Sequence, residues 1–289
     1  MRLSILFIVF YIITAPLSAQ GEFSGGFKAG LNFSNIDGPV ENENESFSVN
    51  TGFHIGATMM YSFTDVIGAK AELMYSQKGT QYSYKGDSYF TFYTSGTNEG
   101  IPIYATGQRS MDISVSNTYL DLPVMIYARV GKFEFEAGVN AAVLISSRGS
   151  GGVKFSGISL AGSKIEEFTS AIDYAYFSKE RGFEALISSE DIIVNTLAAH
   201  QPTNMNAYYE AADNKEKKYN SLDFGLNAGI AYFFNKGLYI GVRGNLGLTD
   251  ITNEAQDLAL EALGQGNTYT TRNDEDKNVS IQASLGFRF

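Results

Sequence analysis

Residues 279–289 alternate strictly between apolar and polar or small side chains, and no other stretch constrains the fold as strongly. Successive side chains of a strand point to opposite faces, so one face of this stretch would be wholly apolar. The apolar positions are Val279, Ile281, Ala283, Leu285, Phe287 and Phe289. The closing strand of a membrane β-barrel needs such a face toward lipid. A membrane β-barrel is therefore the hypothesis for the whole chain.

Composition agrees with a β-structure and excludes several kinds of chemistry. The chain has 289 residues, among them 30 Gly, 18 Tyr and 21 Phe, but only 5 Pro and no Cys or Trp. Aromatic residues favour strands, and the lack of Cys excludes disulfides, thiolate metal sites and cysteine nucleophiles. A net charge of −10 argues against a nucleic-acid partner, because phosphate binding needs a basic surface. No cofactor or metal motif is evident, and we expect neither.

Residues 1–19 have the features of a secretory signal peptide. Arg2 precedes an apolar run over residues 3–13, and the small residues Ser18 and Ala19 follow. A single membrane anchor is a weaker alternative, because the run is shorter than the roughly 20 residues that a spanning helix requires. Residues 20–289 are then expected to form one domain outside the cytoplasm.

Seven further segments alternate like residues 279–289. The eight predicted strands cover residues 25–34, 52–63, 67–77, 119–130, 132–146, 221–234, 238–248 and 279–289. Each is about ten residues or slightly longer, the length that a tilted strand needs to cross a bilayer. The predicted fold class is all-β, an eight-stranded antiparallel up-and-down transmembrane β-barrel with long, partly helical extracellular loops. A ten-stranded barrel remains an alternative if residues 152–161 enter the wall.

The connections alternate between short and long. Tight turns follow the second, fourth and sixth strands, whereas residues 35–51, 78–118, 147–220 and 249–278 form long connections. Outer-membrane barrels have short periplasmic turns and long extracellular loops, so we expect both termini in the periplasm. Nine outward aromatics then fall at periplasmic strand ends and predict an interfacial girdle. They are Phe27, Tyr61, Phe63, Phe133, Phe135, Tyr232, Phe234, Phe287 and Phe289.

The inward face carries five positive and five negative side chains. They are Lys28, Lys70, Arg129, Arg243 and Arg288 with Glu72, Asp121, Glu134, Glu136 and Asp223. Unpaired buried charges are costly, so we predict that these ten residues pair inside a lumen filled by side chains. A proton or ion relay is the functional alternative.

The long connections offer candidate binding features. Acidic residues cluster in the first (Asp37, Glu41, Glu43, Glu45) and the last (Asp274, Glu275, Asp276), without the ligand spacing of a calcium loop. The second is rich in aromatics that could anchor a partner or continue the neighbouring strands. Helical spacing of Ile165, Phe168, Ile172 and Tyr176 predicts a helix over residues 164–179. Further helices are predicted over residues 190–200 and 254–263.

Only two histidines, His54 and His200, could serve a hydrolase. His54 points inward and His200 lies in the third long connection, and neither has an obvious neighbouring serine and carboxylate at the spacing that a hydrolytic site needs, although partners could converge in space. We therefore predict no enzymatic activity. A lipid or peptide hydrolase using His54 is kept as an alternative.

Three motifs resemble the PorT-like outer-membrane β-barrel family of Bacteroidota. Residues 27–34 (FKAGLNFS) resemble its first-strand pattern, residues 72–79 (ELMYSQKG) its third, and residues 119–123 (YLDLP) its fourth, with Asp121 where Glu is usual. The shorter Asp121 carboxylate leaves its interior partner open. The resemblance implies a barrel fold and an outer-membrane location, and it covers the strands but not the third long connection. It also suggests, as an alternative function, an accessory role in protein secretion of the type IX kind.

Taken from the residues and the resemblance, the expected function is non-enzymatic, either structural or partner-binding through the extracellular loops. The expected surroundings are outer-membrane lipid, the barrel assembly machinery during insertion, and an extracellular or envelope protein partner. Phe289 resembles the C-terminal aromatic by which outer-membrane proteins are recognised for insertion. The identity of the partner stays open.

Overall fold

The computed structural model describes residues 22–207, 209–210 and 217–289, so the predicted signal peptide lies outside the described residues. No helix in this part of the chain is long and apolar enough to cross a membrane. The described residues form eleven strands and four short 3-10 helices. The strands are β1 (Glu22–Asp37), β2 (Glu45–Ser62), β3 (Ile67–Thr94), β4 (Pro102–Val130), β5 (Phe133–Ser159), β6 (Lys164–Ala175), β7 (Leu186–Val194), β8 (Leu197–Met205), β9 (Leu222–Phe233), β10 (Leu238–Gly247) and β11 (Lys277–Arg288).

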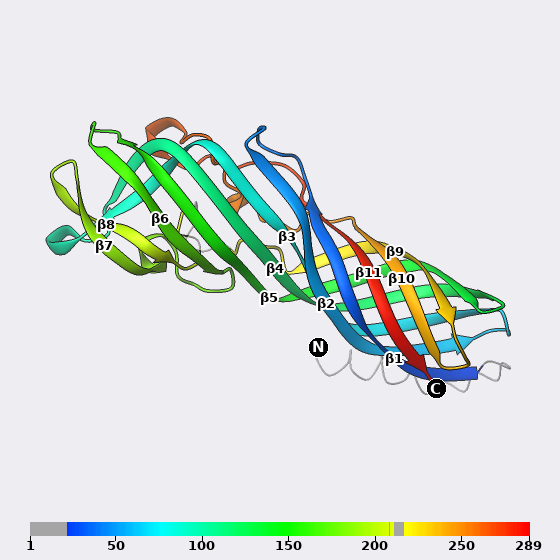
Figure 1. The fold of residues 1–289 in the computed structure, drawn as a ribbon. Helices are drawn as coiled ribbons and strands as arrows, with labels where there is room; N and C mark the ends of the chain where they lie inside the picture. Colours follow the sequence, from blue (N-terminus) through cyan, green and yellow to red (C-terminus); the bar gives the residue numbers. More distant parts are fainter. Residues whose placement is uncertain (1–21, 208, 211–216) are drawn as a thin grey trace, which may run out of the picture.

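Eight of these strands pair in a closed, antiparallel cycle. The order is β1, β2, β3, β4, β5, β9, β10 and β11, and β11 pairs back with β1 from Gly26↔Arg288 to Asp37↔Lys277. We call this part the eight-strand cycle. It forms one end of the molecule in Figure 1, where β9, β10 and β11 lie side by side and the C-terminus is found.

Three strands, β3, β4 and β5, continue far beyond the eight-strand cycle and form a second body, the lobe (residues 79–118 and 147–207). There β6 pairs with β5, β8 pairs with both β6 and β3, and β7 pairs with β8. The strands β3, β4, β5, β6 and β8 thus make a second, smaller cycle at the opposite end of Figure 1. The lobe and the eight-strand cycle share three continuous strands.

The two bodies bury opposite kinds of side chain. On the eight-strand cycle the outward face is apolar, with Leu122, Val139 and Leu285 each about half exposed, and the inward face is polar. The lobe has an apolar core that includes Phe90, Phe92, Phe155 and Phe168, with ring centroids 5.0 to 6.2 Å apart. An exposed apolar band of this extent needs a non-aqueous surrounding or a partner.

The prediction of eight strands with bounds at 67–77, 119–130 and 132–146 is wrong, because β3, β4 and β5 are much longer and three more strands follow them. On β5 the reason is a β-bulge, where Thr118↔Ser146 is followed by Tyr119↔Leu144. The extra residue moves the buried positions from even to odd numbers, from Leu144 to Val153 and Phe155. The period of two is broken there, so the sequence pattern stops although the strand continues. Residues 152–161, offered as an extra wall segment, lie in this continuation of β5 and the turn after it.

The helix predicted over residues 164–179 is also wrong, since residues 164–175 form strand β6. A β-bulge between the pairs Phe155↔Phe168 and Gly157↔Ile165 places Ile165 and Phe168 on the same buried face. Their spacing of three residues imitates a helical turn. The strand then continues with a period of two through Ser170 and Ile172, which are both buried.

The two other predicted helices are wrong as well. Residues 190–200 form the end of β7, a tight turn and the start of β8; Asn195 and Thr196 both adopt positive φ, as a two-residue hairpin turn requires, although neither is Gly. Of residues 254–263, only Glu254–Gln256 is a 3-10 helix. Further along, the backbone N–H groups of residues 260 and 261 donate to a distant carboxylate, that of Glu41, instead of to helical carbonyls.

Candidate functional site

The ten predicted interior charges lie on the inward face of the eight-strand cycle, and each has an opposite charge within 4.0 Å. Glu72 of β3 is the centre of the group. Lys28 Nζ lies 2.7 Å from its Oε2, and the Arg243 guanidinium donates two hydrogen bonds of 2.8 and 2.9 Å. Two cations on one carboxylate compensate the loss of its hydration.

The remaining pairs extend this group across the interior. They join Arg243 to Glu136 (2.6 Å), Lys70 to both Glu136 and Glu134, and Arg129 and Arg288 to Glu134 (2.7 and 4.0 Å). A void beside Glu72 and Arg243 has only about 20 Å³, enough for about one or two water molecules. The interior is therefore filled at this level by paired side chains.

One interior cation, Lys78, is missing from the predicted set. Its Nζ lies 3.2 Å from Asp121 Oδ1 and 4.0 Å from Asp223 Oδ2, and it stands over the Tyr119 ring at 5.1 Å. Lys78 supplies the partner that was left open for Asp121. The strand was predicted to end at residue 77, although Lys78 continues the even-numbered inward positions of Lys70 and Glu72, and this parity could have identified it.

All nine predicted girdle aromatics lie on the outward face, near the tight turns and the C-terminus. The seven phenylalanines are 45 to 69% exposed, and the two tyrosines are partly buried against neighbouring rings. Ring centroids of Phe27 and Phe289 are 5.7 Å apart, and those of Phe133 and Tyr232 are 5.2 Å apart. The rings thus form adjoining pairs around one end of the eight-strand cycle.

The two histidines occupy different environments. His54 is 1% exposed, with Nδ1 2.7 Å from Asn32 Oδ1 and Nε2 2.8 Å from Ser284 Oγ. These partners resemble part of a hydrolytic site, but the void that Ser284 lines is the one of about 20 Å³, which does not hold a lipid or a peptide. The geometry is that of a buried, hydrogen-bonded histidine.

His200 of β8 lies beside polar side chains that were not predicted from the sequence. Its Nδ1 lies 3.0 Å from Ser189 Oγ and 3.3 Å from Asp191 Oδ1, and its Nε2 lies 3.2 Å from Glu99 Oε1. Because Asp191 shares Nδ1 with the serine, carboxylates face both ring nitrogens. The imidazole therefore links β7 and β8 to the turn between β3 and β4.

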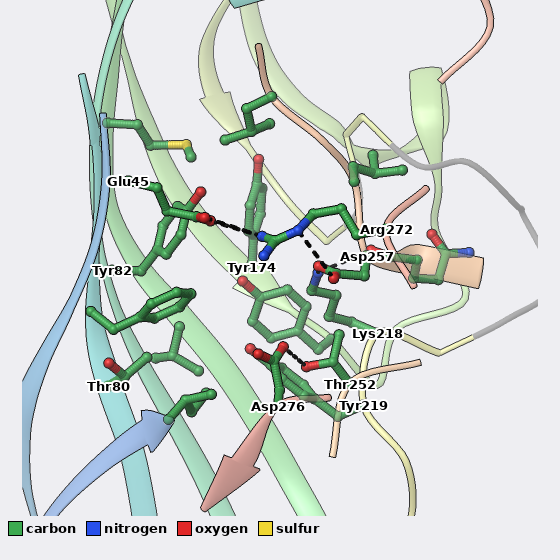
Figure 2. Close-up of a pocket in the computed structure, with 18 of the residues that line it drawn as sticks. Glu45, Thr80, Tyr82, Tyr174, Lys218, Tyr219, Thr252, Asp257, Arg272 and Asp276 are labelled. Carbon is green, nitrogen blue, oxygen red and sulfur yellow. Dashed lines mark hydrogen bonds and ion pairs between the residues drawn. The ribbon is translucent and has the colours of Figure 1, made fainter. Parts of the chain in front are cut away.

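A cavity of about 140 Å³ lies where the eight-strand cycle meets the lobe, and we call it the mouth cavity. Figure 2 shows Glu45 and Tyr82, which come from β2 and β3, facing Arg272 and Asp257 from the connection 248–276. Most of its lining was not predicted, because the residues come from five strands and three connections. The lining includes Ile36, Glu45, Phe47, Thr80, Tyr82, Arg109, Met111, Tyr174, Tyr176, Glu210, Lys218, Tyr219, Asp257, Leu260, Arg272 and Asp276.

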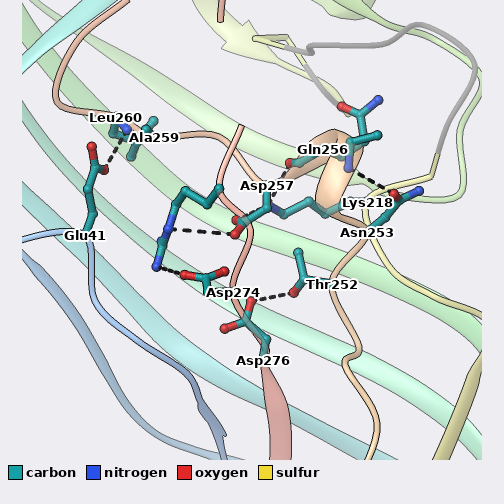
Figure 3. A network of polar contacts seen from close by, with 12 residues as sticks. Glu41, Lys218, Thr252, Asn253, Gln256, Asp257, Ala259, Leu260, Asp274 and Asp276 are labelled. Atoms are coloured by element: carbon teal, nitrogen blue, oxygen red, sulfur yellow. Dashed lines mark hydrogen bonds and ion pairs between the residues drawn. The ribbon is translucent and has the colours of Figure 1, made fainter. Parts of the chain in front are cut away.

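The connection 248–276 is held over the mouth cavity by ion pairs (Figure 3). Arg272 pairs with Glu45 of β2 at 3.1 Å, with Asp257 at 3.8 Å, and with Asp274. Glu41 accepts hydrogen bonds of 2.7 and 3.0 Å from the backbone N–H groups of residues 260 and 261. The first and last long connections, which were predicted to be acidic, are thus fastened to each other.

Three carboxylates of this connection, those of Asp257, Asp274 and Asp276, lie within 4.8 Å of one another. Burial and then the Asp257 carboxylate raise the pKa of Asp274 to about 6, and burial raises the pKa of Asp276. Burial alone would raise the pKa of Asp257, but Lys218, the hydrogen bond with Asp274 and the charge of Arg272 together outweigh it and lower the pKa of that carboxyl. Lys218 and Arg272 supply positive charge to the cluster, so its geometry is explained without a metal ion.

The lobe leaves one strand edge open. Strand β7 pairs with β8 on one side, and within the described residues no strand pairs with its other side. Ile187 and Ile193 of this strand are 53 and 70% exposed, and Glu190 and Asp191 between them are also exposed. Unpaired backbone groups beside exposed apolar residues make an edge that another strand can join.

Comparison with known proteins identifies the family. Residues 18–253 match the sequence model of the family described as outer membrane protein beta-barrel domain. The chain therefore belongs to this family of outer-membrane β-barrel proteins. Among curated proteins, none matches it.

Several solved structures are similar over most of the chain. The attachment invasion locus protein Ail of Yersinia pestis is 10% identical, with a TM-score of 0.36, over 93% of this chain and 99% of Ail. OprG of Pseudomonas aeruginosa is 12% identical, with a TM-score of 0.31, over 94% of this chain and 99% of OprG. Neisserial surface protein A is 11% identical, with a TM-score of 0.31, over 93% of this chain and 99% of that protein. The family assignment rests on the sequence match.

Proposed function

We propose that this chain is a non-enzymatic outer-membrane protein that crosses the membrane with its eight-strand cycle and binds a partner with its lobe. The outward apolar face and the inward charge network support the first part. An apolar face can contact lipid, whereas charged side chains inside a membrane must face the protein interior. The lumen is filled, so the proposal includes no diffusion pore. The proposal agrees with the resemblance to PorT-like barrels, because the residues that carry this resemblance include Lys28, Glu72, Lys78 and Asp121, which form ion pairs in the interior.

The proposed orientation places the aromatic girdle at the periplasmic interface and the lobe outside the cell. Aromatic rings prefer the headgroup level, and the girdle lies at the end with the tight turns. Barrels of this kind have their long connections outside. During insertion the partners are outer-membrane lipid and the barrel assembly machinery. No feature of the described residues favours a part in secretion over partner binding, so the proposal does not extend to secretion.

The open edge of β7 is the observation that carries the binding function. An extended segment of a partner could pair with this edge through its backbone, as strand addition does in other recognition domains. Exposed Glu190 and Asp191 lie between exposed Ile187 and Ile193, so the fitting segment has basic residues flanked by apolar ones. Two antiparallel copies of β7 centred on Glu190 would set the two Glu190 side chains against each other, which disfavours self-association. The proposed occupant is therefore a basic, extended segment of an extracellular or envelope protein.

Site-specific photo-cross-linking tests this proposal on the full chain in its native envelope. A photoreactive residue at position 193 should yield a discrete cross-linked species, whereas one at exposed Val40 should not. The substitution Glu190→Lys should remove that species by charge repulsion, whereas Glu43→Lys, an equally exposed reversal in another connection, should leave it. Equal cross-linking from positions 193 and 40, or no effect of Glu190→Lys, would contradict the proposal.

A further inference from the structure

The mouth cavity is large enough for one small ring-shaped molecule. Its volume of about 140 Å³ is close to that of the roughly 150 Å³ apolar cavity in another protein that binds benzene. It lies between the strand ends and the connection 248–276 (Figure 2), and no residue of β7 is among its lining residues. The side chains of Lys218 and Arg272 are 22 and 13% exposed, so the cavity reaches solvent on that side.

The walls of the cavity present flat rings and hydroxyl groups. Phe47 and the rings of Tyr82, Tyr174 and Tyr176 line it, next to Met111. Burial raises the pKa values of these three tyrosines, which therefore keep their O–H groups near neutral pH. Such walls can cover the apolar faces of a ring and also offer hydrogen bonds to its edge.

The charges that line the cavity are compensated within the protein. Arg109 binds Glu210 through two hydrogen bonds of 2.8 Å, and Lys218 and Arg272 pair with carboxylates as described above. A charged ligand would displace one of these pairs and leave a buried charge alone. The lining thus favours a neutral ligand.

One buried donor of the lining has no acceptor among the described residues. Arg109 is 2% exposed, and its Nε–H finds no hydrogen-bond partner among the described residues, although its other two nitrogens are occupied. An unsatisfied buried donor is costly, so an acceptor atom at this point would be favourable. The carboxylates of Glu45 and Asp276, also in the lining, can accept from hydroxyl groups of the same molecule.

We propose that the mouth cavity binds a neutral, polyhydroxylated ring of monosaccharide size. The tyrosine and phenylalanine rings cover its faces, Arg109 Nε–H donates to one of its oxygens, and the carboxylates accept from its hydroxyl groups. An aromatic hydrocarbon of equal size would leave these polar groups unsatisfied. The proposal goes beyond partner binding at the β7 edge and does not depend on it.

Calorimetric titration of the full chain folded in detergent tests this site, with neutral hexoses, a uronic acid and phenol as probes. At least one neutral hexose should bind saturably, and more tightly than the uronic acid or phenol. Met111→Trp and, in the covering connection, Leu258→Trp fill the cavity and should each raise the Kd about tenfold or more, since the well-packed walls cannot yield to the larger ring. Ile187→Trp, on the exposed edge of β7, is the matched control and should bind as the unchanged chain does.

Two readouts keep the tests separate. A variant counts only if it keeps the heat-dependent gel mobility of the folded barrel, and two cavity-filling positions guard against the failure of one to fold. Met111→Trp should keep cross-linking from position 193, and Glu190→Lys should keep hexose binding. Absence of heat with every hexose, unchanged affinity in both filled variants, or preference for phenol would overturn the saccharide site and leave the β7 proposal standing.

Discussion

The eight-strand cycle and the lobe share three strands but bury opposite kinds of side chain. In the part of β4 that belongs to the eight-strand cycle, Asp121 and Met125 are buried, and the apolar residues Leu122 and Val124 are exposed. In the part that belongs to the lobe, the apolar residues Ile113 and Val115 are buried instead. In the eight-strand cycle the buried charged groups must neutralise one another. In the lobe the buried apolar groups must exclude water. Which residues of a strand are buried in this chain therefore depends on what its opposite face contacts.

Glu72→Ala gives the sharpest test of the interior of the eight-strand cycle. The change leaves Lys28 and Arg243 without their shared carboxylate, and removing one partner of a buried pair typically costs about 3–5 kcal/mol. The free energy of unfolding in urea, followed by the gel mobility of the folded barrel, should fall by that amount.

The controls for this prediction come from the lobe and the surface. Phe90→Ala, in the lobe core, should speed amide exchange in the lobe but leave the barrel mobility unchanged. Glu275→Ala removes an exposed pair with Lys277 and should have no measurable effect. If Glu72→Ala behaves like Glu275→Ala, the charge network does not stabilise the wall.

Val139→Arg tests the difference in surroundings between two exposed aliphatic positions. Val139 is 55% exposed on the eight-strand cycle, and an outward Arg near the middle of a bilayer costs about 2–4 kcal/mol. Stability measured in lipid vesicles should drop accordingly. Ile193→Arg, at a site on the lobe that is 70% exposed, should leave folding unaffected. Equal effects of the two substitutions would mean that the outward face of the cycle is not in lipid.

The pH dependence of the connection 248–276 is the smallest expected effect. The folded pKa of Asp274, about 6, exceeds its usual value of 3.8, so the folded connection binds more protons between those values and loses stability as the pH rises through them. The raised pKa of Asp276 acts in the same direction, whereas the lowered pKa of Asp257 acts below this window. Limited proteolysis of the connection should be faster at pH 7 than at pH 5. Asp274→Asn should reduce that difference, and persistence of the full difference would refute the assignment to Asp274.

The sequence predicted the cycle better than the lobe for a physical reason. Where one face of a strand contacts lipid or solvent and the other faces the interior, apolar and polar residues alternate. The positions of the ten interior charges and the nine girdle aromatics were predicted from this alternation. In the lobe both faces of a strand become buried, as from Tyr89 to Thr94, and the alternation disappears. Bulges near Ile145 and Phe168 shifted the pattern further. The mouth cavity is formed by residues that the lobe brings together from distant parts of the sequence, so no local sequence pattern could predict it.

The continuity of β3, β4 and β5 also dictates an order of events during biogenesis. Their far halves, with β6, β7 and β8, belong to chain segments that lie between wall strands, so under the proposed topology a body with its own core has to reach the outside while the wall is still an open sheet. The pairing of β1 with β11, which joins Gly26 to Arg288, closes that sheet. Under this topology we expect the lobe segments to cross the membrane before the seam between the first and last strands closes.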